Sequence, residues 1–143
     1  MKIYQKYIYR LQDHLNKTDE SRFTAQQLLK LHKEAELKDC PLIVELGVDR
    51  GQSTKIFLNA IDNKTDSKLI SIDIKDCSEA ATSNKWEFIK QDSADINSIL
   101  TYKPEIKNGI DILYVDSLHT PEHVEKEVYN FFQYLNEEAL IFF

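Results

Sequence analysis

Residues 42–53 read LIVELGVDRGQS, an apolar run followed by a loop that carries two of the chain's three glycines. The run LIVEL is short, apolar and partly β-branched, which is typical of a strand buried on both faces of a sheet. Gly47 and Gly51 lie four positions apart, just before a segment with helical spacing. The stretch therefore predicts a strand, a tight loop and a helix whose N-terminus faces that loop.

The chain beyond this stretch repeats the alternation of strand and helix. Apolar runs at 69–74, 86–89, 110–115 and 139–143 predict four further strands. Residues 56–61, 96–100 and 120–135 have apolar residues at helical spacing, and Thr120 with Pro121 forms a typical helix start. Residues 78–84 are ambiguous and fit one or two helical turns. This alternation predicts an α/β fold with a parallel sheet and helices on both faces.

The first forty residues are predicted to be helical. Ile3, Tyr7, Ile8, Leu11 and Leu15 form an amphipathic stripe, and the polar residues 17–22 are expected to form a turn. Thr24 followed by Gln27 resembles a capping box, which predicts a second helix from there to about Ala35. We therefore expect a helical extension at 1–40 and a ligand-binding domain at 41–143.

Composition narrows the classes of function. A chain of 143 residues is the size of one ordinary domain, and its net charge of -6 disfavours a nonspecific nucleic-acid binder. Two cysteines make neither a disulfide framework nor a CxxC metal motif. Charges interrupt the N-terminal stretch throughout, so no membrane association is expected and the cytoplasm is the expected compartment.

Polar residues follow each predicted strand, where open parallel sheets bind their ligands. The loop with Gly47, Gly51 and Ser53 offers free N–H groups to an anion, although a tight turn without a ligand would also explain it. Asp73 ends the second strand and can accept both hydroxyls of a ribose, or simply be a solvated carboxylate or helix cap.

The third and fourth strands are followed by two further polar pairs. Asp92 can accept a hydrogen bond from an adenine amino group and Ser93 can donate one to a ring nitrogen, although a helix cap explains them nearly as well. Asp116 and His119 can bind a metal or transfer a proton, whereas His119 can also be an ordinary loop residue.

Taken together, these motifs resemble the class I S-adenosylmethionine-dependent methyltransferases. Glu45-x-Gly47-x-x-x-Gly51-x-Ser53 is similar to their first motif, Asp73 to the ribose-binding acid and Asp92-Ser93 to the adenine-side motif. The segment IDILYVDSLHTPEHVEKEVYNFF, residues 110–132, resembles the branch that contains sugar and antibiotic-tailoring O-methyltransferases. The resemblance covers about residues 40–143 and implies a Rossmann-like, doubly wound sheet of order 3-2-1-4-5.

The resemblance implies O-methylation of a small molecule such as a sugar or secondary metabolite. Glu45, Ser53 and the loop amides would hold the amino-acid end of S-adenosylmethionine, and Asp116 and His119 would face the acceptor. A divalent metal such as Mg²⁺ at Asp116 is a further expectation. A non-catalytic nucleotide-binding or adaptor domain is the alternative, and an NAD-dependent dehydrogenase fits the glycine pattern less well.

The family's sheet continues beyond the fifth strand, so we expect this chain to lack the C-terminal part of that fold. The run ALIFF at 139–143 is apolar and would lie at a sheet edge. Such an edge pairs readily with another chain, which predicts self-association or low solubility.

Overall fold

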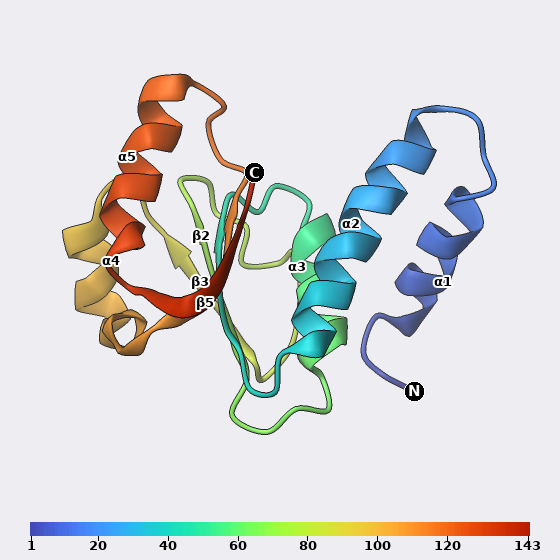
Figure 1. The fold of residues 1–143 in the computed structure, drawn as a ribbon, viewed down its shortest axis with the longest axis horizontal. Coiled ribbons are helices and arrows are strands. Elements are labelled where there is room, and N and C mark those ends of the chain that lie inside the picture. Colours follow the sequence, from blue (N-terminus) through green and yellow to red (C-terminus); the bar gives the residue numbers. More distant parts are fainter.

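The computed structural model describes all 143 residues as a parallel sheet between two layers of helices (Figure 1). Its five strands follow the order β3-β2-β1-β4-β5, and every neighbouring pair is parallel. The predicted fold class and strand order are thus confirmed. The elements, in chain order, are α1 (Gln5–His14), α2 (Glu20–Leu37), β1 (Leu42–Leu46), α3 (Gln52–Ile61), β2 (Lys68–Asp73), β3 (Trp86–Lys90), α4 (Ile96–Tyr102), the 3₁₀ helix η1 (Pro104–Asn108), β4 (Ile110–Val115), α5 (Pro121–Phe132) and β5 (Leu135–Phe142).

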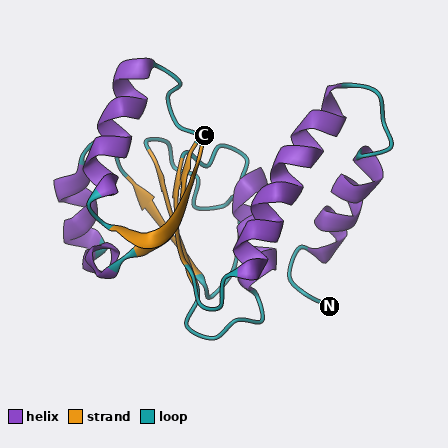
Figure 2. Cartoon of the chain, viewed as in Figure 1, coloured by secondary structure: helices purple, strands orange, loops and turns teal.

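The side chains of β1 alternate between two hydrophobic cores. Ile43 packs into the core shared with α1, α2 and α3, whereas Val44 and Leu46 pack into the core shared with α4, η1 and α5. Figure 2 shows the strands edge-on between these two helical layers. Because successive side chains of a strand point to opposite faces, Glu45 faces the α3 side, which matters for the site.

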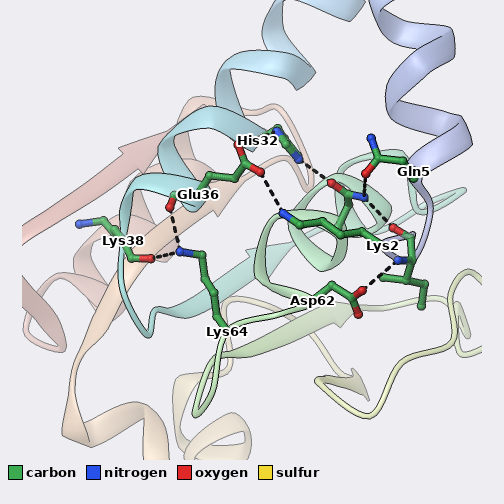
Figure 3. A network of polar contacts seen from close by, with 9 residues as sticks. Lys2, Gln5, His32, Glu36, Lys38, Asp62 and Lys64 are labelled. Carbon is green, nitrogen blue, oxygen red and sulfur yellow. Dashed lines mark hydrogen bonds and ion pairs between the residues drawn. The ribbon is translucent and has the colours of Figure 1, made fainter.

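Polar contacts fasten the N-terminal helices to α3 (Figure 3). The Asn59 side chain on α3 contacts His32 of α2, with 2.7 Å between Oδ1 and the ring Nε2, and donates from Nδ2 to the Ile3 carbonyl at 2.7 Å. The Ile3 amide donates to Asp62 just beyond α3, at 2.9 Å. Residues of α1 and α2 also share one core with the sheet. The division at residue 40 stays a prediction.

Two predicted boundaries are wrong. α2 begins at Glu20 rather than at Thr24, because the Asp19 side chain caps it by accepting from the Ser21 amide at 3.0 Å. β5 begins at Leu135, which the sequence pattern placed in the preceding helix; Leu135 instead pairs with Ile110 of β4. The polar residues 136–138 are exposed, as an edge strand permits, and this concealed the start of the strand.

The segment left open at 78–84 forms turns and irregular backbone rather than a helix. None of the helices combines the length and apolar character needed to cross a lipid bilayer.

Candidate functional site

The loop after β1 is shaped by its two glycines. Gly47 has φ +95°, and a Cβ there would lie 2.2 Å from the backbone oxygen of Asp116. Gly51, at φ +75°, precedes the first residue of α3, and its Cβ would lie 2.9 Å from that of Ala80. The space that these glycines leave is therefore filled by the protein itself. Their positive φ and close backbone approach account for them without a ligand.

Glu45 and Ser53, predicted to hold one end of a cofactor, bind each other beneath this loop. Glu45 is fully buried and accepts hydrogen bonds from the hydroxyls of Ser53, Thr54 and Ser71. Burial raises the pKa of the Glu45 carboxyl to about 7, and the three hydroxyl donors counteract part of this shift. Glu45 and its three hydroxyl partners thus join β1 and β2 to the first turn of α3.

Asp73 lies at the end of β2, where the sequence predicted it to act. Its Oδ2 accepts from the amides of Val48 at 2.8 Å and Asp49 at 3.2 Å, and its Oδ1 accepts from the Lys75 amide at 2.9 Å. Partial burial acts to raise the pKa of Asp73, but the backbone donors outweigh it and the net pKa is lowered. The Cys77 thiol, a weak donor, also interacts with this carboxylate, so a ligand hydroxyl would compete with it for the fourth acceptor site.

A cavity of about 540 Å³ opens at the C-terminal ends of the strands. Its lining includes Gly47, Asp73, Asp92, Ser93, Asp116 and His123. Five of these six are residues that the sequence singled out, from four different strand ends. The volume is within the range that holds small molecules and cofactors.

His123 and Glu127, which lie one turn apart on α5, were not predicted from the sequence. Fully buried Glu127 accepts from the hydroxyls of Ser93 and Ser117, and its Oε1 is 3.1 Å from His123 Nε2. The Ser93 hydroxyl proton is thus directed at Glu127, rather than toward a ligand nitrogen as expected. Two polar residues four positions apart on the buried side of a predicted helix were the available signal.

Asp116 and His119 do come together. His119 Nε2 is 3.0 Å from Asp116 Oδ1, and the Tyr114 hydroxyl donates to Asp116 Oδ2 at 3.1 Å. Burial, with the nearby Asp116 charge, raises the pKa of Tyr114, so Tyr114 remains a donor. Tyr114 was not predicted, because its place in an apolar strand hides it.

A second cavity, of about 330 Å³, adjoins the first across Asp116. Val48, Asp49 and Asp116 line both cavities. Thr24 and Gln27 of α2 form part of the second wall, together with Arg50, whose side chain has no ion-pair partner. Helix α2 therefore contributes to this end of the molecule.

The metal prediction rests on Asp116 alone. No group of three or more His, Cys, Asp or Glu side chains is placed to hold a metal ion. The side chains present do not form a Mg²⁺ site by themselves, so we derive no step through a metal.

The sequence of this chain matches one known protein family. A family model described as a methyltransferase domain matches residues 44–143. A search of curated proteins found no match.

Three solved structures are similar in fold. The MycE methyltransferase of the mycinamycin biosynthetic pathway, in complex with Mg and SAH, aligns at 15% identity with a TM-score of 0.68, over 94% of this chain and 38% of that one. CalS11, a TDP-rhamnose 3'-O-methyltransferase of calicheamicin biosynthesis, aligns at 14% identity with a TM-score of 0.65, over 95% of this chain and 75% of that one. The SAH-bound Podospora anserina methyltransferase PaMTH1 aligns at 12% identity with a TM-score of 0.62, over 95% of this chain and 58% of that one. This chain thus spans well under half the length of MycE.

Proposed function

Because this chain belongs to the methyltransferase-domain family, we propose that it binds S-adenosylmethionine and methylates a hydroxyl group of a small molecule. The observation that carries the proposal is the pair of cavities that meet at Asp116. The larger cavity would hold the cofactor and the smaller one the acceptor. A small sugar or secondary metabolite as acceptor, a cytoplasmic location and the lack of a nucleic-acid partner belong to the same proposal.

The lining of the larger cavity fits the cofactor. Asp73 would accept from a ribose hydroxyl in place of the weakly donating Cys77 thiol, and Asp92 would accept from the adenine amino group. Asp92 has acceptor capacity left for this, since its one side-chain hydrogen bond is from the Ala94 amide to Oδ1 at 2.9 Å. Glu45 and Ser53 would act indirectly, because they anchor the loop after β1 to the first turn of α3. The amides of Gly47, Val48, Asp49 and Gly51 are bonded within the protein, so they do not serve as the free donors that the sequence predicted.

S-adenosylmethionine, when bound, supplies a methyl group on a sulfonium, which an acceptor oxygen attacks. The chain's own task is to orient the acceptor and remove its proton. In the tautomer whose Nε2 hydrogen points at Asp116, His119 Nδ1 is free to take that proton. Asp116 then stabilises the resulting imidazolium, and Tyr114 holds the Asp116 carboxylate in place.

Two measurements test the proposal. Calorimetric titration with S-adenosylhomocysteine should show binding at one site per chain. Transfer of a labelled methyl group should then occur to a member of a panel of hydroxylated small molecules, sugars included. An absence of binding would refute the proposal, whereas binding without transfer to any acceptor would favour a non-catalytic nucleotide-binding domain.

A further inference from the structure

Glu127 is an unusual residue for the buried side of a helix. Its side chain is fully buried, and its Oε2 has no hydrogen-bond partner. Removing a carboxylate from water is costly unless its oxygens are hydrogen-bonded, so an apolar residue would stabilise the α5 interface better. The contacts of Glu127 indicate what offsets this cost: its Oε1 binds the hydroxyls of Ser93 and Ser117.

These two serines follow different strands of the sheet. Ser93 follows β3 and Ser117 follows β4, and both line the cavity together with His123. His123 Nε2 lies 3.1 Å from Glu127 Oε1 and 3.2 Å from Ser93 Oγ. One buried carboxylate thus joins the segments that follow β3 and β4, although Glu127 itself does not line the cavity.

Glu127 also decides which kind of hydrogen bond Ser93 can offer to a ligand. A serine hydroxyl has one proton and two lone pairs, and a carboxylate can only accept. Because the proton goes to Glu127, Ser93 has only acceptor capacity left for the cavity. The adjacent Asp92 carboxylate, which also lines the cavity, is likewise an acceptor.

We infer that Glu127 is a positioning residue that makes the base end of the cofactor cavity select an exocyclic amino group. This inference rests on the proposed function, since it concerns how the adenine of S-adenosylmethionine is distinguished. Two acceptors, Asp92 and Ser93, match the two hydrogens of an amino group. In a nucleobase with a carbonyl oxygen in place of the amino group, that oxygen would face the two acceptors. None of these groups could donate a hydrogen bond, so all would stay unpaired.

The test compares S-adenosylhomocysteine with its deaminated analogue, S-inosylhomocysteine, by calorimetric titration. The wild type should bind the adenosyl compound at least about tenfold more tightly, the scale of one lost hydrogen bond. In Glu127→Gln the new amide can donate to Ser93, which frees the serine proton to turn toward the ligand carbonyl. The ratio of the two affinities should then fall by about fivefold or more.

A purely structural role predicts a different result. Loosening of the cavity walls would weaken the binding of both compounds alike and leave the ratio of their affinities unchanged. That result would overturn the inference. Glu125→Gln is the matched control, because Glu125 is exposed on the same helix and should change neither affinity. If Glu127→Gln does not fold, Ser93→Ala should lower the ratio in the same way, and an unchanged ratio there would also overturn the inference. Failure of the wild type to bind S-adenosylhomocysteine would instead refute the proposed function.

Discussion

The Val48 amide donates a hydrogen bond to Asp73 Oδ2 over 2.8 Å and so joins the loop after β1 to the end of β2. The residue predicted to hold a ribose is therefore also the residue that fixes the loop. Since the Asp49 amide binds the same oxygen, the two roles of Asp73 are physically linked. Variants of Asp73 have to be judged by both cofactor affinity and stability.

Asp73→Ala should weaken the binding of S-adenosylhomocysteine by roughly 1.5–3 kcal/mol, the scale for losing hydrogen bonds to a charged group. Calorimetric titration measures this loss, and thermal unfolding reports how much the loop has been loosened. Asp76→Ala is the control, because Asp76 lies just beyond Asp73 in the segment after β2 but bonds to Ser78 rather than lining the cavity. Unchanged affinity in Asp73→Ala would remove Asp73 from the ribose site.

The three glycines allow the loop's role in binding to be separated from its role in folding. Gly47→Ala and Gly51→Ala should each lower the free energy of unfolding by roughly 1–3 kcal/mol, since a side chain is strained at these positive φ values. Gly47→Ala should be the worse of the two, because its Cβ meets rigid backbone at 2.2 Å, whereas that of Gly51 meets Ala80 at 2.9 Å.

Gly109→Ala is the control for this pair. Gly109 has φ +124° and precedes β4, at the end of the strand away from the cavity. Its alanine variant should lose stability and keep its cofactor affinity. Equal loss of affinity in all three variants, measured below their unfolding temperatures, would mean that the loop glycines have no specific part in binding.

The buried Glu45 predicts how stability depends on pH. Its pKa is raised from 4.5 to about 7 by folding, so between these values the folded state binds more protons than the unfolded state. Stability must therefore fall as pH rises from about 4.5 to 7, and level off above that. The stabilisation that Glu45 provides through its raised pKa is fully present below pH 4.5.

Glu45→Gln removes this titration while keeping the side chain's shape. The difference in unfolding temperature between wild type and Glu45→Gln should shift in favour of the variant as pH rises from 5 to 8. Taking the difference cancels the pH-dependent contributions of the other carboxylates to stability. Asp73 is one of these, and its lowered pKa makes stability rise rather than fall with pH. A difference that does not change with pH would contradict the raised pKa.

The sequence predicted the sheet well because its signals are local. The apolar runs and the loop with Gly47 and Gly51 mark strands that are buried on both faces. Thr120 marks the start of α5 equally clearly, and its side chain does accept from the His123 amide at 3.3 Å. The start of α2 was missed because Asp19 and Thr24 are both good caps, and spacing alone does not rank them.

The site was harder to predict, because hydrogen-bond partners depend on packing between distant segments. Ser93 was found, but its bond to Glu127 joins residues 34 positions apart. Ser53 was expected to face a ligand, whereas the alternation along β1 places Glu45 beneath it. Strand-end position thus identifies which residues are near the cavity, and only the fold shows which atoms they have free.

His119 is predicted to act on the acceptor and not on the cofactor. His119→Ala should lower kcat for methyl transfer by roughly 10²–10⁴-fold, the usual contribution of a general base. Its affinity for S-adenosylhomocysteine should stay unchanged, because His119 lines only the smaller cavity. Full activity in this variant would exclude His119 as the base.

The free edge of β5 leads to the last prediction, which concerns association between chains. β5 pairs with β4 on one side only, and Leu140, Ile141 and Phe142 are half-buried beside the exposed Phe143. Such an edge has unpaired backbone groups that a second chain can bind. We therefore expect light scattering during gel filtration to show an apparent mass that rises with protein concentration.

Charge on the same strand gives this association a recognisable salt dependence. Glu137 and Glu138 are exposed on β5, and pairing two such edges brings like charges together. Added salt screens that repulsion, so association should strengthen as ionic strength rises. A constant monomer mass at all concentrations would show that the edge is protected, and Lys38, which donates to the Glu138 carbonyl at 3.1 Å, would be the first candidate for that protection.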